Sequence, residues 1–189
     1  IGRATSLALA GRGCHLALAD IDEAAATETA ALIERAGGRA TTHVVDVRQP
    51  DAVEAMRDEV LAAHGSCHIL VNNAGVTSAG AFADESLDDL HWIVDINVWG
   101  VVHGCRAFLP ALRAADEAHI VNLSSMVGLL GLPHNVAYSL TKGAVRSFSE
   151  ALRSELVSTP VGLSVAFPGA TPPHIHATAR GPAADRLAP

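Results

Sequence analysis

Short apolar runs alternate with longer helical patterns along the whole chain. The short runs, rich in apolar side chains, are the predicted strands at 15–20, 42–47, 67–73, 118–125 and 161–167. Between them, apolar residues recur at the three- and four-residue spacing of an amphipathic helix. The predicted helices are 22–36, 51–65, 87–115 and 136–157. Strands that are apolar on both faces and alternate with helices predict a parallel sheet with helices on both sides.

The predicted helices begin and end at ordinary signals. Gly37 and Gly38 stop the first helix, and Asp51, directly after Pro50, is the predicted N-cap of the second. The longest pattern, 87–115, is predicted as one continuous helix. Its apolar stripe consists of Leu90, Ile93, Val94, Val101, Cys105, Phe108 and Leu112.

Composition narrows the classes of function. A content of 49% apolar and 17% charged residues describes a globular protein. A net charge of −7 with scattered basic residues argues against nucleic acid as the main partner. The three cysteines have no CxxC spacing, which predicts reduced thiols. No apolar stretch approaches the roughly 20 residues of a membrane span, so we expect a cytoplasmic protein with no membrane partner.

Polar or turn-forming residues follow every predicted strand. They are Asp20, Asp46, the run Asn72 to Gly75, the pair Ser124 and Ser125, and the pair Pro168 and Gly169. Each one alone is an ordinary turn former. In a parallel α/β sheet, however, ligands bind beyond the carboxyl ends of the strands. Five such ends in succession therefore predict a shared cleft.

The segment AYSLTKGAVRSF, residues 137–148, contains Tyr138, the only tyrosine of the chain. Lys142 follows four residues later, so a helix places both side chains on one face. A free phenol has a pKa of about 10, and an adjacent ammonium is expected to lower it by about one to three units. Such a phenol can exchange a proton near neutral pH. With Ser125 to hold an oxygen at the same sheet edge, this favours alcohol–carbonyl interconversion, for which a cofactor must carry the hydride.

Asp20 fits the need for such a cofactor. An acid at the end of a strand in a Rossmann-like fold accepts hydrogen bonds from an adenosine ribose. The same carboxylate repels a 2′-phosphate, and no basic residue directly follows it. This favours NAD as the cofactor and makes NADP the less favoured alternative.

Taken together, these motifs resemble the classical short-chain dehydrogenase/reductase family. The matching stretches, in family order, are LALADID, DV at 46–47, NNAG at 72–75, DINVWGVVHGCRAFLP at 95–110, IVNLSSMVG at 120–128, YSLTK at 138–142 and PG at 168–169. The resemblance implies a Rossmann-like, doubly wound parallel sheet in three α/β/α layers. It also implies an NAD- or NADP-dependent oxidoreductase for a small alcohol or carbonyl substrate, assembled as a homodimer or homotetramer.

The resemblance assigns roles to individual residues. It implies a catalytic set of Ser125, Tyr138 and Lys142, with Ser125 chosen over Ser124 because the family serine lies thirteen residues before the tyrosine. Asn97 matches the asparagine that holds a water in the family's proton relay, and Lys142 is also expected to bind the nicotinamide ribose. The implied cofactor contacts are Gly2, Asp20, Asp46, Val47, Asn73, Ala74, Gly75, Tyr138, Lys142, Pro168 and Gly169.

The match departs from the family pattern in three places. The family's first strand and its TGxxxGxG loop are missing, and Gly2 matches the last glycine of that loop. Pro173 stands where the family has a threonine, which leaves Thr171 as the candidate cofactor contact. The usual last helix and strand are also missing. We therefore expect one Rossmann domain over 1–189, truncated at both ends, with 170–189 as a mobile substrate loop.

The segments that border the predicted substrate pocket are mostly apolar, which favours a hydrophobic or small alcohol substrate. They are 76–86, 126–128, 134–135 and 170–189. Trp92 and Trp99 are interpreted as packing or subunit contacts. His174 and His176 are interpreted as part of a surface loop, because a metal site needs a further ligand.

Three other functions compete with an oxidoreductase. A non-catalytic nucleotide-binding protein would have the same fold but no need for the proton-relay residues. A methyltransferase also uses an acid after a strand but does not need the YxxxK spacing after a serine. A serine hydrolase is disfavoured because NLSSMVG is not the GxSxG of a nucleophile elbow.

Overall fold

The computed structural model describes residues 1–169 and 179–184 of the chain. These residues fall into two compact units, Ile1–Cys67 and His68–Pro189. The predicted cofactor contact at Thr171 and the histidine pair at 174 and 176 lie outside the described residues.

In the first unit, two parallel strands pack against helices. Its elements are α1 (Gly2–Ala10), β1 (His15–Asp20), α2 (Glu23–Arg35), β2 (Arg39–Val44) and α3 (Pro50–His64). β1 pairs with β2 in parallel, with His15 opposite Arg39. The core forms where Leu16 and Leu18 of β1 pack against Ala30 and Ile33 of α2. The side chain of Asp22 caps α2 by accepting from the backbone N–H of Ala25 at 3.0 Å.

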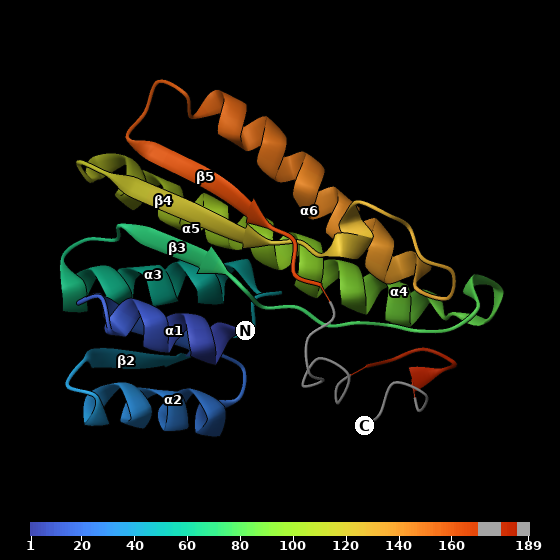
Figure 1. The fold of residues 1–189 in the computed structure, drawn as a ribbon, viewed down its shortest axis with the longest axis horizontal. Helices are drawn as coiled ribbons and strands as arrows, with labels where there is room; N and C mark the ends of the chain where they lie inside the picture. The colour runs from blue at the N-terminus through green and yellow to red at the C-terminus, as the bar shows by residue number, and fades with distance from the viewer. Residues whose placement is uncertain (170–178, 185–189) are drawn as a thin grey trace. The chain divides into compact units, whose positions relative to one another are not determined.

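The second unit contains a three-stranded parallel sheet in the order β3-β4-β5. Its elements are β3 (Ile69–Asn72), a 3-10 turn (Phe82–Asp84), α4 (Leu87–Val94), a π-helical turn (Asp95–Trp99), α5 (Gly100–Ala114), β4 (Ala118–Leu123), a 3-10 turn (Met126–Gly128), α6 (Val136–Glu155) and β5 (Val161–Ala166). Figure 1 shows these three strands side by side with their arrowheads at the same edge. The residues that follow each strand therefore meet at that edge.

The helical pattern at 87–115 is interrupted in its middle. α4 and α5 continue one another along a single rod (Figure 1), but the π-helical turn Asp95–Trp99 lies between them. Such a turn inserts an extra residue into an α-helix and is common at functional sites. Asn97 lies within this turn and is completely buried.

Two predicted boundaries in the first unit are wrong. The strand expected at 42–47 is β2, Arg39–Val44, because its polar first half pairs in register with β1. Asp46 therefore lies in the turn after the strand. The expected N-cap Asp51 is inside α3, which begins at Pro50 with Gln49 as its N-cap. Proline suits the first helical position because that position needs no backbone donor.

α6 is amphipathic, 20 residues long, and buries one face that includes Ala137, Thr141, Lys142, Val145 and Ser149. This face packs on β4 and β5. The opposite face of α6 points to solvent, and Leu140 on that face is 60% exposed. Across residues 1–169 and 179–184, no helix combines the length and the apolar character needed to cross a membrane.

Candidate active site

Tyr138 and Lys142 lie next to each other on α6. The Nζ atom of Lys142, the only lysine of the chain, is 5.7 Å from the centroid of the Tyr138 ring. Lys142 is only 3% exposed, and its ammonium donates to the carbonyl of Leu123 at 2.9 Å. The end of β4 therefore fixes a buried cation beside the phenol.

Ser125 lies just beyond β4 and faces the same phenol. The hydroxyl of Ser125 lies close enough to the phenol of Tyr138 to favour its ionised form. The Oγ atom of Ser125 also accepts from the backbone N–H of Val127 at 3.4 Å, which orients the serine within the turn. The backbone N–H of Met126, the residue directly after Ser125, donates to the carbonyl of Pro168 at 3.1 Å. The serine turn is thus fastened to the segment that follows β5.

The pKa values of the pair are set mainly by burial. Burial raises the pKa of Tyr138 above its ordinary value, and the nearby Ser125 hydroxyl opposes that rise. Burial lowers the pKa of Lys142 to about 8. The expected lowering of the phenol pKa is therefore wrong for this structure, because the loss of water around the phenolate outweighs the groups that favour it. Tyr138 is a protonated hydroxyl at neutral pH.

Asn97 connects the π-helical turn to its surroundings through its side-chain amide. Its Oδ1 accepts from the backbone N–H of Val76 at 2.8 Å, and its Nδ2 donates to the carbonyl of Val76 at 2.9 Å. The same Nδ2 donates to Oγ1 of Thr141 on α6 at 3.0 Å. The amide therefore holds the segment after β3 against the helix that carries Tyr138.

Gly75 is the point where this segment passes closest to the site. A Cβ atom at Gly75 would lie 3.3 Å from both Oδ1 of Asn97 and Nζ of Lys142. This spacing is tighter than most side-chain contacts, so the absence of a side chain lets the backbone approach both polar groups. Gly75, Asn97 and Lys142 thus converge on one small region.

The remaining residues predicted for this edge also lie there. Asn73 and Ala74 follow β3 and are exposed, while Gly75 is half-buried. Pro168 is half-buried and Gly169 exposed after β5. The structure therefore brings these segments and Ser125 to one edge of the three-stranded sheet, as the sequence predicts.

Four other predicted cofactor contacts belong to the first unit. Asp20 is exposed at the end of β1, and its Oδ1 accepts from the backbone N–H of Asp22 at 3.0 Å. Asp46 accepts from the backbone N–H of Arg48 at 3.0 Å and from the guanidinium Nε of the same residue at 2.9 Å. These hydrogen bonds keep the pKa of Asp46 below its ordinary value. Val47 is half-buried, and Gly2 opens α1.

Sequence reasoning missed two buried hydroxyls that support the site. Thr141 is fully buried. Its Oγ1 accepts from Asn97 and donates to the carbonyl of Tyr138 at 2.9 Å. Ser124 donates from Oγ to the carbonyl of Lys142 at 2.8 Å. The only signal in the sequence is that polar residues occupy positions on the buried face of α6 and at the end of β4.

A second polar network lies inside the same unit, away from Tyr138. Nδ2 of Asn72 donates to Oδ1 of Asn122 at 2.8 Å, and Nδ2 of Asn122 donates to Oγ of Ser149 at 2.9 Å. Burial raises the pKa of the neighbouring Cys105 thiol to about 11, so the thiol stays protonated. The network links β3, β4 and α6, which indicates a structural role.

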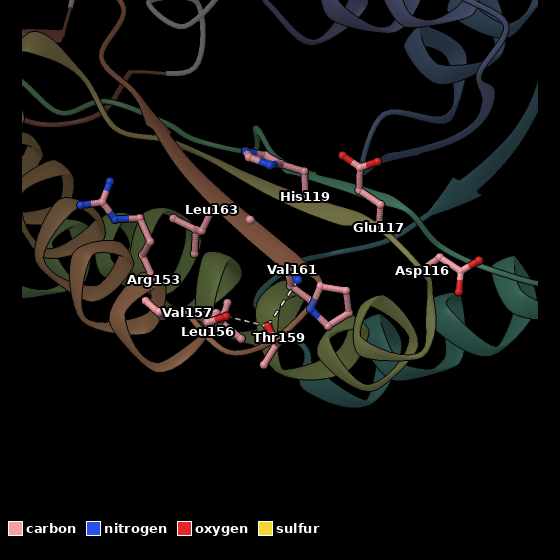
Figure 2. Close-up of a pocket in the computed structure, with 11 residues that line it drawn as sticks. Asp116, Glu117, His119, Arg153, Leu156, Val157, Thr159, Val161 and Leu163 are labelled. Carbon is pink, nitrogen blue, oxygen red and sulfur yellow. Dashed lines mark hydrogen bonds between the residues drawn. The ribbon is translucent and has the colours of Figure 1, made fainter.

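An open pocket lies at the other end of the same strands. Its lining residues lie before and within the start of β4, at the start of β5 and at the end of α6, as Figure 2 shows: Asp116, Glu117, His119, Arg153, Leu156, Val157, Thr159, Pro160, Val161, Gly162 and Leu163. Ser125 and Pro168 follow the opposite ends of these strands. The pocket is therefore separate from the Tyr138 site.

Comparison with known proteins identifies the family. The profile described as short chain dehydrogenase matches residues 1–182. The chain belongs to this family. The resemblance inferred from the sequence motifs is thereby confirmed.

Two relatives illustrate the similarity. The chain is 43% identical over 179 residues to the probable oxidoreductase EphD of Mycobacterium tuberculosis, covering 94% of this chain and 30% of that protein. It is 36% identical over 166 residues to the cyclopentanol dehydrogenase of Comamonas testosteroni, covering 87% of this chain and 66% of that protein. The chain thus spans less than two thirds of the length of either relative.

Solved structures agree with the fold. A short chain dehydrogenase/reductase from Burkholderia phymatum in complex with NAD superimposes with a TM-score of 0.89 at 36% identity, covering 100% of this chain and 66% of that one. A metagenomic short-chain oxidoreductase in complex with NADP gives a TM-score of 0.85 at 32% identity, covering 90% and 77%. These similarities confirm the predicted Rossmann-like α/β fold.

Proposed function

We propose that this chain catalyses the NAD(P)-dependent interconversion of a secondary alcohol and a ketone or aldehyde, with Tyr138 as the general acid and base. The observation that carries the proposal is the buried ammonium of Lys142, 5.7 Å from the centroid of the Tyr138 ring, with the Ser125 hydroxyl beside the same phenol. A proton donor and an oxygen-orienting hydroxyl therefore adjoin one another at the sheet edge where this fold binds ligands. The bound nicotinamide supplies or accepts the hydride.

Each residue has a distinct part in this proposal. Ser125 donates a hydrogen bond to the substrate oxygen and holds it within reach of the phenol. Tyr138 gives its proton to that oxygen during reduction and takes a proton from the alcohol during oxidation. Lys142 favours the phenolate that forms when the proton leaves, since a nearby cation stabilises developing negative charge.

Asn97 has a supporting part in the proposed proton transfer. Its amide holds the backbone of Val76 and the hydroxyl of Thr141, and its Oδ1 faces the same region as Nζ of Lys142. We assign it the role of keeping α6 and the segment after β3 at a fixed spacing and of holding a relay water between them. The position of Asn97 in a π-helical turn supports this role, because such turns recur at functional sites.

NAD is the proposed cofactor. The exposed carboxylate of Asp20 at the end of β1 supports this preference, because it would accept hydrogen bonds from a ribose and repel a 2′-phosphate. Solved relatives bind NAD in one case and NADP in another, so both nucleotides belong in the test. The proposed contacts with the nucleotide remain Gly2, Asp20, Asp46, Val47, Asn73, Ala74, Gly75, Tyr138, Lys142, Pro168, Gly169 and Thr171.

A substrate screen tests the proposal. The complete protein is incubated with NADH or NADPH and small diketones or alicyclic ketones, and with the oxidised nucleotides and secondary alcohols, steroids or sugars. Cyclopentanol is included because a relative is named for it. We expect turnover of at least one compound, with kcat/KM higher for NAD than for NADP. Nucleotide binding without turnover of any compound would instead favour a non-catalytic nucleotide-binding protein.

We further propose that the protein assembles as a homodimer or homotetramer. Large apolar side chains are exposed to solvent on α6 and directly before α5. The exposed fractions are 42% for Val136 and 60% for Leu140 on α6, and 50% for Trp99 before α5. Light scattering of the complete protein measures its mass directly. A mass equal to that of one chain would contradict the proposal.

A further inference from the structure

A short segment near the carboxyl end of the described residues pairs with the backbone after β3. Residues 179–184 belong to the second unit. Arg180 forms a parallel β-bridge with Ser78. The backbone N–H of Arg180 donates to the carbonyl of Thr77 at 3.2 Å, and the N–H of Ala79 donates to the carbonyl of Arg180 at 3.0 Å. We name residues 179–184 the clasp and residues 77–80 the rim.

Glycines allow the clasp and the rim to interlock closely. Gly181 has φ = +96°, and a Cβ atom there would lie 2.6 Å from the carbonyl oxygen of Ala79. Gly80 has φ = +153°, and a Cβ atom there would lie 2.2 Å from Cγ of Pro182. Larger residues would be strained at both positions and would separate the two segments. The pairing therefore depends on these two positions having no side chain.

The side chain of Arg180 anchors the clasp to α4. Its guanidinium carbon lies 4.3 Å from the centroid of the Trp92 ring, and its Nη1 lies 3.7 Å from Oδ1 of Asp89. Asp89 is itself held, because Ser86 donates to its Oδ2 at 2.9 Å. Each contact is weak at a partly exposed site. Together they fix the guanidinium between two side chains of one helix.

The rim connects this anchor to the proposed catalytic residues. At one end it continues from Val76, which Asn97 holds through two hydrogen bonds. At the other end, the backbone N–H of Gly80 donates to the carbonyl of His134 at 3.0 Å, just before α6 begins. The rim therefore runs from the Asn97 and Lys142 region to the start of the helix that carries Tyr138.

We propose that the rim borders the substrate beside Tyr138 and that Arg180 is a positioning residue that holds the rim in place. Arg180 links α4 to the rim through its side chain on one side and its backbone on the other. Loss of the side chain leaves the backbone bonds but frees the clasp from α4, so the rim gains freedom. The proposal rests on the proposed oxidoreductase function of the Tyr138 site.

The kinetic test compares Arg180→Met and Arg180→Lys in the complete protein. We expect Arg180→Met to raise the KM for the alcohol or carbonyl substrate by roughly three- to tenfold, the scale of losing weak contacts. Its kcat and its KM for the nucleotide should stay close to those of the wild type, and Arg180→Lys should recover part of the loss. Arg146→Met is the matched control, because Arg146 pairs with Glu150 on α6 at 2.9 Å, away from the rim. An unchanged substrate KM in Arg180→Met would overturn the proposal.

Two further readouts do not need activity. In a Trp99→Phe background, Trp92 is the only tryptophan among residues 1–189, so the emission difference between Arg180→Met and the parent should come from Trp92, whereas Arg146→Met should cause none. Hydrogen exchange at the amides of Ala79 and Gly80 should become faster in Arg180→Met. If the wild type turns over no substrate, the proposed function is wrong. The exchange rates of Ala79 and Gly80 still test whether Arg180 holds the rim in place. Unchanged emission or unchanged exchange would overturn the role of Arg180.

Discussion

The side-chain amide of Asn97 donates to the hydroxyl of Thr141 at 3.0 Å, across two helical elements that are 44 residues apart in sequence. Thr141 in turn donates to the backbone carbonyl of Tyr138. A π-helical turn on one element is thereby connected, through two hydrogen bonds, to the turn of α6 that carries the phenol. The position of Tyr138 thus depends in part on Asn97, through the hydroxyl of Thr141.

Asn97→Ala should destabilise the protein and reduce its activity. The substitution removes the partner of the half-buried backbone groups of Val76 and the donor to the buried hydroxyl of Thr141, and a buried group left unsatisfied costs about 1–3 kcal/mol. We expect the free energy of unfolding to fall by about 2 kcal/mol or more. Urea unfolding measures this. Asn135→Ala is the control, because the Asn135 amide donates to the carbonyl of the preceding residue. Equal stabilities of the two variants would contradict the role of Asn97.

The free energy of unfolding should rise with pH above about pH 8 because of Lys142. Burial lowers the pKa of Lys142 to about 8, whereas an unfolded lysine has a pKa of about 10.4. Between these values the unfolded chain holds a proton that the folded chain has released, so stability rises with pH. Below pH 8 both states are protonated and the penalty of the buried charge is complete.

Comparison with Lys142→Met isolates this effect. From about pH 8 to about pH 10.4, the free energy of unfolding of the wild type should rise relative to that of the variant by up to about 3 kcal/mol. Urea titrations at several pH values give both curves. Parallel curves would show that the ammonium is not buried as the structure has it.

The single tyrosine allows its ionisation to be followed directly. Phenolate absorbance in the near ultraviolet, taken as the difference from Tyr138→Phe, reports Tyr138, the only tyrosine among residues 1–189. Because burial raises the pKa of Tyr138, the midpoint should lie above the ordinary value of about 10. Ser125→Ala should raise the midpoint further, since the hydroxyl that favours the phenolate is lost. A midpoint below 10 would restore the expectation made from the sequence.

Asp20 should control the choice of nucleotide. Asp20→Ser removes the negative charge at the end of β1, where the carboxylate is exposed and accepts one backbone hydrogen bond. We expect the ratio of kcat/KM for NAD over NADP to fall by about tenfold, the effect of about 1.4 kcal/mol. Asp22→Ser is the control for charge, because serine can take over the N-cap role of Asp22 on α2. If the two variants change the ratio equally, Asp20 is not the selecting residue.

The order of strands and helices could be predicted because its signals are local. The apolar run at 15–20 and the glycines after the first long helix each specify their element without help from the rest of the chain. The convergence of Ser125, Tyr138 and Lys142 followed from helical spacing and from the common edge of parallel strands. Those three residues therefore needed little tertiary information.

Other features depend on contacts that the sequence pattern does not contain. The π-helical turn at Asp95–Trp99 keeps the helical period nearly intact, so the pattern at 87–115 reads as one helix. The start of β2 at Arg39 is polar and is a strand because β1 pairs with it. The direction of the Tyr138 pKa shift was wrong because burial, a tertiary property, outweighs the neighbouring groups.

The most direct test of the account is hydride transfer by Tyr138→Phe in the complete protein. The variant removes only the hydroxyl, so nucleotide affinity should change little while kcat falls by about 10²–10⁴-fold, the scale of general acid–base catalysis. Phe148→Leu, also on α6, controls for altered packing. Single-turnover measurements of nicotinamide fluorescence separate a change in nucleotide affinity from a change in the rate of hydride transfer. A Tyr138→Phe protein that transfers hydride at the wild-type rate would contradict the central claim that this phenol exchanges the proton.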